Sequence, residues 1–213
     1  MEDKICLADT RNQIDDFVIE EIEKLGYEVK RMTLPFGDFA FLDNLTYCVD
    51  IKSSSGGIVE VAKNICSSDH QRLKREIQKC FDWNGEICFL VANEDGVKKI
   101  EDLTTWQVPN FKSDMWGYKY LYNNKWISKK QLLTYISEKN ICDIQKKRFK
   151  IHSKGDIMTL VNPTTLMKAI KTMSEPNHYK EGLTVRFAFC SKEDAGKKII
   201  QILEYWQKKY KKT

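Results

Sequence analysis

The chain alternates short apolar runs with amphipathic stretches, which is typical of a domain built from both strands and helices. Strands are predicted where apolar residues run continuously or at every second position: 5–8, both sides of a bend at 35–37, 45–52, 86–92 and 185–190. Helices are predicted where apolar residues recur at helical spacing: 14–25, 58–81 with a break near 67–68, from 164, and after the capping box Ser191-x-x-Asp194. This order predicts the α/β class.

The character of the chain changes after Trp106. Residues 107–155 are rich in aromatic residues and lysine, with a hairpin predicted around Asn123-Asn124 and a helix over 129–139. The apolar strand and helix that follow need a sheet on which to pack, so we interpret this segment as an insertion into one domain. The predicted organisation is a core of 1–106 and 156–205, an insertion at 107–155 and a basic tail at 206–213.

Composition excludes several classes of protein. Hydrophobic residues make up 42% and charged residues 31% of the 213 residues, as in an ordinary soluble domain. The longest nearly apolar stretch, 87–92, is too short to span a membrane. The seven cysteines are scattered without a C-x-x-C pair, and there are only three histidines. We therefore expect neither a disulfide framework nor a zinc site. We expect a cytoplasmic location, because the cysteines are not arranged for an oxidising compartment.

Charge is distributed unevenly within the net +5 of the chain. Residues 1–110 carry 13 Lys and Arg against 21 Asp and Glu, whereas residues 111–213 carry 22 against 9. Carboxylates in one part and cations in the other suit a site that holds metal ions for a polyanionic substrate. The alternative is that these charges simply solvate surface helices.

The candidate chemistry lies at Gly37-Asp38 and Asp50-Ile51-Lys52. On a strand, Asp50 and Lys52 share one face while Ile51 lies on the other. With Asp38 presented by a neighbouring bent strand, two carboxylates and the backbone carbonyl of Ile51 form a set of oxygen ligands for Mg²⁺ or Mn²⁺. Lys52 would stabilise charge on a phosphate, and Gly37 would allow the bend. The alternative is a half-exposed strand on which charged residues merely alternate.

Several motifs occur in the order found in a known family: Ala8-Asp9-Thr10-Arg11, LPFGDF at 34–39, VDIK at 49–52, EVAKNI followed by DHQRLKRE at 60–76, and RFAFCSKEDAGKKIIQIL at 186–203. Through them the chain resembles the XPF-type branch of the PD-(D/E)xK nucleases, in particular its stand-alone, phage-like members, over roughly 1–106 and 156–205. The resemblance implies a restriction-endonuclease-like central mixed sheet flanked by helices, with the aromatic and lysine-rich segment inserted.

The resemblance also implies a function. It is that of a divalent-metal-dependent DNA endonuclease that hydrolyses phosphodiester bonds with Mg²⁺ or Mn²⁺, in the repair, recombination or processing of phage or mobile-element DNA. The implied partners are DNA, branched or single-stranded, and a second copy of the chain, because XPF-type relatives commonly form dimers. For a phage-encoded protein the location would be the host cytoplasm.

Carried over position by position, the resemblance makes Asp38 and Asp50 the metal ligands, together with the backbone carbonyl of Ile51, and makes Lys52 the catalytic lysine. Asp9 would be an auxiliary acid near the metal, and Glu60 a further acid that lines the cleft.

The candidate substrate contacts lie in two places. The resemblance makes Arg11 a contact to the scissile phosphate and places Arg72 on one helix face with Glu76, for which a plain surface ion pair is the alternative. In the insertion, Lys119 and Lys125 are interleaved with aromatic residues on which bases would stack. The alternative is that its tyrosines, at every second position, form a hairpin face packed on the domain.

Departures from the family pattern motivate a second hypothesis. The family's E-R-K is Asp-Ile-Lys here, so the arginine is replaced by Ile51, and Gly56 stands where a further acid is expected. No paired helix-hairpin-helix module follows, and the chain has only 10 glycines with which to build one. The alternative function is a catalytically impaired DNA-binding or recruitment module on a nuclease fold.

Overall fold

The computed structural model describes residues 4–12, 16–66, 70–106, 114–122, 125–128, 145–152, 162–179 and 184–210. Between 114 and 152 it describes the backbone of the strands. The chain divides into two compact units: residues 1–109 together with 160–213, and residues 110–159. We call them the core unit and the inserted unit. The predicted insertion, 107–155, falls on the inserted unit with ends that differ by a few residues.

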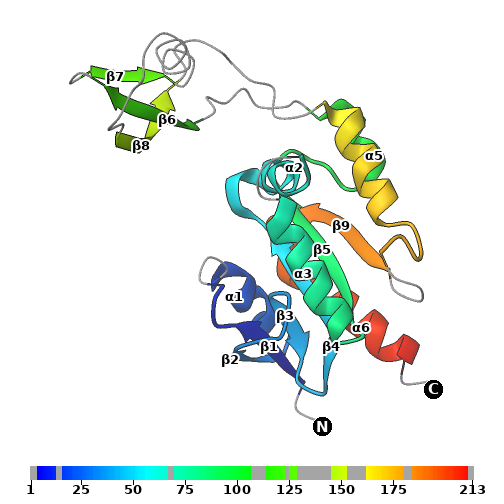
Figure 1. Cartoon of the computed structure of the whole chain (residues 1–213). Helices are drawn as coiled ribbons and strands as arrows, with labels where there is room; N and C mark the ends of the chain where they lie inside the picture. The colour runs from blue at the N-terminus through cyan, green and yellow to red at the C-terminus, as the bar shows by residue number, and fades with distance from the viewer. Residues whose placement is uncertain are drawn as a thin grey trace. The chain divides into compact units, whose positions relative to one another are not determined.

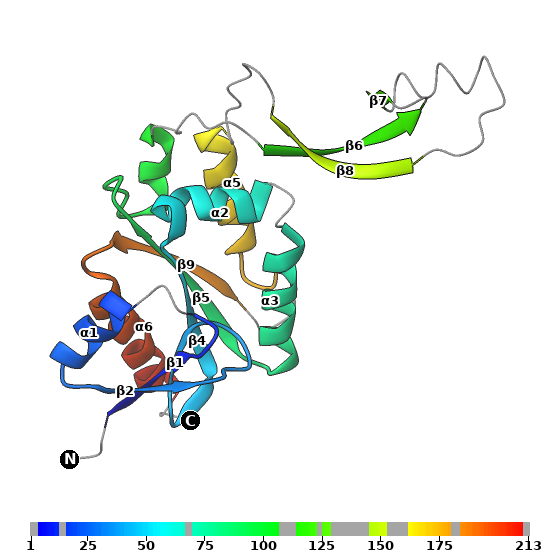
Figure 2. The same cartoon turned by 90° about the vertical axis from the view of Figure 1, so that its left-hand side faces the viewer.

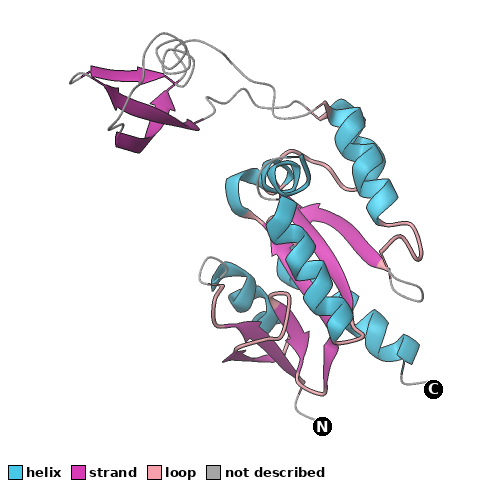
Figure 3. Ribbon diagram, in the orientation of Figure 1, coloured by secondary structure: helices cyan, strands magenta, loops and turns pink. Residues whose placement is uncertain are grey.

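The core unit contains a six-stranded mixed sheet, in magenta in Figure 3. Its order is β2-β1-β3-β4-β5-β9. The antiparallel pairs are β1 with β3 and β3 with β4, whereas the other neighbours are parallel. The strand bounds are Ile5–Asp9 for β1, Glu28–Met32 for β2, Phe39–Phe41 for β3, Asn44–Lys52 for β4, Glu86–Asn93 for β5 and Val185–Ser191 for β9.

Helices cover both faces of this sheet, as the two views in Figures 1 and 2 show. On one face, α1 (Asp16–Lys24) packs against α6 (Ala195–Tyr210). On the other lie α2 (Ile58–Cys66), α3 (His70–Asp82) and α5 (Pro163–Met173). Two short 3-10 helices, η1 (Ser54–Gly56) and η2 (Ile100–Thr105), follow β4 and β5. The α/β class with a helix-flanked sheet is confirmed.

Strand β4 shows why both faces are covered. Val49 and Ile51 are buried among side chains of α1 and α6, whereas Cys48 is buried among those of α3. The two-residue period of a strand therefore places Asp50 and Lys52 on the α2–α3 side of the sheet, with Cys48. This confirms the predicted division of β4 into an apolar face and a face that carries the acid and the amine.

Most predicted elements of the core are present. The predicted helix over 58–81 corresponds to α2 and α3, and its predicted break near 67–68 lies outside the described residues. The 3-10 helices η1 and η2 were not predicted, because short segments of this kind carry little periodic signal. At the predicted capping box, the Asp194 N–H donates to Ser191 Oγ at 3.2 Å, which is one half of such a box, and the Ser191 hydroxyl donates to the Asp194 carboxylate at 2.7 Å. Helix α6 begins at Ala195, so Asp194, not Ser191, directly precedes the helix.

The predicted basic tail at 206–213 is wrong for residues 206–210. Helix α6 continues to Tyr210, and Trp206 is only 1% exposed. The Trp206 indole N–H donates to Glu86 Oε2 at 3.1 Å, and the Tyr210 hydroxyl donates to the other oxygen of Glu86. The lysines of this segment give it a solvated appearance in the sequence, whereas its aromatic residues anchor it to the start of β5.

The inserted unit contains a three-stranded antiparallel sheet of order β7-β6-β8. Its strands are β6 (Asp114–Tyr122), β7 (Lys125–Ser128) and β8 (Gln145–His152). The predicted hairpin is therefore confirmed, with β6 and β7 as its arms. Strand β8 was not predicted, because its run of basic residues resembles a solvated surface segment. The helix predicted over 129–139 lies outside the described residues.

Over the stretches that the structure describes, no helix is both long and apolar enough to cross a membrane.

Candidate active site

Three carboxylates lie close together where β1 and β4 end and β3 begins. Asp9 ends β1, Asp50 lies two residues before the end of β4, and Asp38 directly precedes β3, which runs in the opposite direction. Main-chain hydrogen bonds join the three segments: the Asp9 N–H donates to the Asp38 carbonyl, and the Asp38 N–H donates to the Val49 carbonyl, both at 2.8 Å. The strand order thus brings together acids that are far apart in the sequence.

The bend before Asp38 depends on Gly37. Its φ angle is +67°, in the region that favours glycine, and a Cβ atom there would lie 2.7 Å from the Cβ atom of Cys48. The predicted role of Gly37 in this bend is thereby confirmed. After the bend, Asp38 Oδ2 accepts a hydrogen bond of 2.8 Å from the Ile51 N–H. The Asp38 carboxylate is therefore held against the backbone between Asp50 and Lys52.

Asp50 and Lys52 form a buried ion pair, with the two residues 6% and 8% exposed. The Lys52 ammonium also lies 5.5 Å from the centre of the Phe89 ring, a cation–π distance. Burial raises the pKa of Asp50, and the neighbouring Lys52 counteracts this rise. Burial acts to lower the pKa of Lys52, but the charges of Asp50 and Asp38 outweigh it, so the pKa is raised. Lys52 is therefore a cation at neutral pH.

Helices α2 and α3 line the opposite wall of the site. Glu60, in the first turn of α2, accepts hydrogen bonds through Oε2 from the Ser54 N–H at 3.0 Å and from the Ser54 hydroxyl at 2.5 Å. On α3, Glu76 accepts a 3.4 Å hydrogen bond from the Gly37 N–H. Arg72 lies near enough to Asp50 to favour its charged form. Glu60 thus holds the loop after β4, and Glu76 holds the bend before Asp38.

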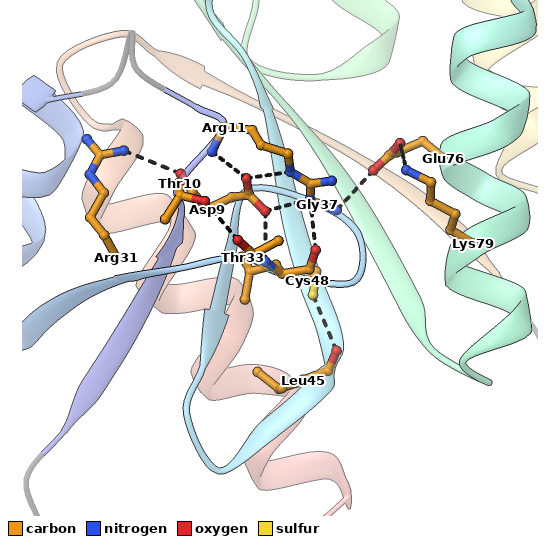
Figure 4. Close-up of polar contacts among 11 residues, drawn as sticks. Asp9, Thr10, Arg11, Arg31, Thr33, Gly37, Leu45, Cys48, Glu76 and Lys79 are labelled. Carbon is orange, nitrogen blue, oxygen red and sulfur yellow. Dashed lines mark hydrogen bonds and ion pairs between the residues drawn. The ribbon is translucent and has the colours of Figure 1, made fainter.

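Asp9 is engaged by Arg11, as Figure 4 shows. The Arg11 side chain donates to both oxygens of Asp9, at 2.8 and 2.6 Å, and its backbone N–H donates to Oδ1 at 2.7 Å. The Leu34 N–H donates to Oδ2 at 2.8 Å. Burial acts to raise the pKa of Asp9, but these hydrogen bonds together lower it. In this arrangement Asp9 orients Arg11, whose side chain remains 54% exposed.

These groups line one cavity of about 520 Å³. Its described lining contains the five acids and three cations that the sequence analysis considered for the core: Asp9, Asp38, Asp50, Glu60, Glu76, Arg11, Lys52 and Arg72. Ile51 also borders the cavity, although its side chain is buried on the other face of the sheet. Its backbone is therefore the part available to the cavity. The site residues predicted for the core unit therefore all border this one cavity.

The cavity suits a divalent cation by its charge. Once Asp9 and Arg11 are paired, four carboxylates in its described lining face two cations. Across the described residues, no three His, Cys, Asp or Glu side chains are grouped as a metal site by themselves. Mg²⁺ is commonly held by one or two carboxylates, with waters and substrate phosphates as its remaining ligands. Asp38 and Asp50, with the Ile51 carbonyl, would supply the protein's share of such a set.

Some of the lining was missed by sequence reasoning. Asn64 is 8% exposed and donates from its side chain to the Glu60 carbonyl at 2.7 Å. Phe89 lies opposite Asp50 in the register of β4 and β5. Asn64 follows Glu60 by one helical turn, a spacing that would have found it. Phe89 sits within a continuous apolar strand and has no such signal.

The predicted contacts Lys119 and Lys125 belong to the inserted unit. Lys119 lies in β6 opposite Ser128 and Lys147, whereas Lys125 lies in β7 opposite Tyr122. Residues directly opposite in an antiparallel pair share a face, and neighbours along a strand alternate. The two lysines therefore lie on opposite faces of the small sheet.

No protein-family model matches this chain, and no curated protein matches its sequence.

Proposed function

We propose that this chain is a Mg²⁺- or Mn²⁺-dependent DNA endonuclease of the XPF-like kind, with the mixed sheet as a restriction-endonuclease-like core. The observation that carries the proposal is the hydrogen bond from the Ile51 N–H to the Asp38 carboxylate. It fixes Asp38 beside the strand segment on which Asp50 and Lys52 form their ion pair, inside a charged cavity. Two carboxylates and an amine held together in this way are suited to hydrolysis of a phosphodiester.

The chemistry divides between an ion and the protein. Asp38, Asp50 and the Ile51 carbonyl would hold a divalent cation, which would supply positive charge for the phosphate and lower the pKa of water. Lys52 acts as a fixed cation, because its ammonium is held in place by Asp50 and Phe89. It stabilises the negative charge that develops on the phosphate in the transition state.

Two arginines are suited to bind the phosphate. Arg11 is oriented by Asp9 and stays half-exposed at the cavity. Arg72 enters the cavity from α3. Guanidinium groups bind phosphate oxygens in a bidentate manner. Arg11 already uses Nε and Nη2 on Asp9 and the Leu34 carbonyl, so we assign the bidentate contact to Arg72, and Arg11 would contact the phosphate through Nη1. With Ile51 in place of the family's arginine, these two are the arginines in the described lining that remain for this contact.

Cleavage assays on the full-length protein test the proposal. Purified protein is titrated with Mg²⁺ or Mn²⁺ over single-stranded, duplex, flap and branched DNA, with EDTA as the blank. We expect products that require the metal ion and are lost in Asp38→Asn and Asp50→Asn. Asparagine at 38 retains an oxygen to accept the Ile51 N–H, so this variant removes charge with little effect on folding. Asp16→Asn, at a side chain that is 81% exposed, is the matched control.

The outcomes separate the two hypotheses. Cleavage by a folded Asp38→Asn variant at the wild-type rate would refute the assignment of the site. DNA binding by the wild-type protein without products under any of these conditions would favour the catalytically impaired DNA-binding module. Circular dichroism and urea unfolding establish that each variant is folded.

A further inference from the structure

The inserted unit carries the positive excess of the chain. Residues 110–159 contain 11 Lys and Arg against 4 Asp and Glu, whereas the remaining residues contain 24 against 26. The candidate active site therefore belongs to a unit with a slight negative excess. A polyanion would be attracted to the inserted unit rather than to the core unit.

The register of the small sheet sorts aromatic and basic residues onto one face. Directly opposite residues of an antiparallel pair share a face. On one face, four pairs join an aromatic residue of β6 with a cation of β7 or β8: Trp116 with Lys150, Tyr118 with Arg148, Tyr120 with Lys146 and Tyr122 with Lys125. We call these eight residues the aromatic–basic face. The same face also holds Asp114 opposite His152, and Ile127 opposite Tyr120. A row of aromatic residues thus runs along β6, with three cations of β8 on one side and Lys125 of β7 on the other.

The other face has a different composition. Its residues in the described strands include five large apolar ones: Met115, Leu121, Trp126, Phe149 and Ile151. This contrast is typical of an antiparallel sheet with one face toward a core and the other toward water. Lys119 and Lys147 lie directly opposite each other on the apolar face. They can serve as controls for the cations of the aromatic–basic face.

We propose that the aromatic–basic face binds an unpaired stretch of DNA, with bases stacked on the aromatic row and phosphates along the cations. Cations alone would attract duplex and single-stranded DNA alike. Aromatic rings favour unpaired bases, because the faces of the bases in a duplex are already stacked on one another. The proposal rests on the proposed function only for the choice of DNA as the nucleic acid; what it adds is the surface of the inserted unit that holds the unpaired segment.

Fluorescence anisotropy on the full-length protein measures this binding without cleavage, because EDTA is present. The probes are a labelled oligothymidylate of about 20 nucleotides, longer than the site of one single-strand-binding domain, and a labelled duplex of equal length. We expect the single strand to bind at least about tenfold more tightly than the duplex. Tyr118→Ala should weaken single-strand binding about tenfold, because it removes an aromatic ring on which a base would stack. Tyr118→Phe keeps the ring and should bind like the wild type.

A matched pair of charge variants separates the face from general attraction. Lys146→Gln and Lys147→Gln remove the same charge at adjacent residues of β8, but only Lys146 lies on the aromatic–basic face. We expect Lys146→Gln to weaken binding and to lower the slope of log affinity against log salt by about 0.7, the value for one phosphate contact on a single strand. Lys147→Gln should leave both quantities close to the wild type.

Three results would overturn the proposal: equal affinity for single strand and duplex, equal effects of Lys146→Gln and Lys147→Gln, or wild-type binding by a folded Tyr118→Ala variant. Failure of the nuclease proposal would give different results in the binding and cleavage assays. A protein that binds single strands as expected but never cleaves refutes the catalytic assignment alone. A protein that cleaves but whose binding ignores these substitutions refutes the binding face alone.

Discussion

Replacing Asp9 with asparagine tests whether this carboxylate holds Arg11 and the chain before the Gly37 bend. The carboxylate accepts four hydrogen bonds, three from Arg11 and one from the Leu34 N–H. An asparagine side chain has one acceptor oxygen and one NH₂ group, so at least one of these donors would face another donor.

The expected cost follows from the burial of each partner. The Arg11 side chain is 54% exposed, so the loss of its ion pair costs up to about 1 kcal/mol. The Leu34 N–H is buried, and a buried donor left without a partner costs about 1–3 kcal/mol. Together these terms predict that Asp9→Asn lowers the free energy of unfolding by about 1–4 kcal/mol at neutral pH.

The pH dependence has a defined sign. The pKa of Asp9 is lowered by folding, so its carboxylate stabilises the protein above the unfolded pKa of about 3.9. That stabilisation is lost as the pH falls through the folded pKa, because both states then carry a protonated group. The difference between wild type and Asp9→Asn should therefore be constant above about pH 5 and shrink below about pH 4.

Urea unfolding followed by tryptophan fluorescence between neutral and acidic pH provides the measurement. Asp16→Asn serves as the control, because Asp16 is 81% exposed in its pair with Arg31 and should cost less than about 0.5 kcal/mol. An Asp9→Asn variant as stable as this control would refute the reasoning. So would a loss of stability that stays the same at every pH.

Three further predictions follow from the geometry of the core unit. Gly37→Ala should destabilise the protein more than Gly56→Ala in urea unfolding, because both positions have positive φ but a Cβ atom has open space only at Gly56. Glu86→Gln should cost about 1–3 kcal/mol by the same measurement, since Glu86 accepts from the end of α6, whereas the exposed Glu94→Gln should cost little. Lys52→Gln should lower the cleavage rate by about 100-fold or more while DNA affinity changes little; an unchanged rate would remove Lys52 from the reaction.

Much of the core unit was predictable because its signals are local. Period-two alternation along 45–52 places Asp50 and Lys52 on one face without reference to any other strand. Gly37 in LPFGDF indicates a bend by itself, and the spacing of Arg72 and Glu76 indicates one helix face. Each of these predictions depends only on residues a few positions apart, where backbone geometry fixes the relation between side chains.

The hydrogen-bond partners of individual carboxylate oxygens could not be predicted in this way. Asp9 was expected to lie near a metal, whereas its carboxylate is saturated by Arg11 and the Leu34 N–H. Glu60 is bound by Ser54. The Asp9–Leu34 bond depends on where the chain after β2 passes the end of β1, and the Glu60–Ser54 bond on the shape of the loop after β4. Residue type and spacing do not encode such positions.

The sequence by itself determined the strands and helices of the core, the shared face of Asp50 and Lys52, and the separation of an aromatic, lysine-rich segment. Only the tertiary structure decided that Asp9 and Asp38 meet them at one edge, and that Lys119 and Lys125 lie on opposite faces of their sheet. The physical reason is that the repeat of a single strand sets which side chains alternate, whereas strand order and register set which strands become neighbours.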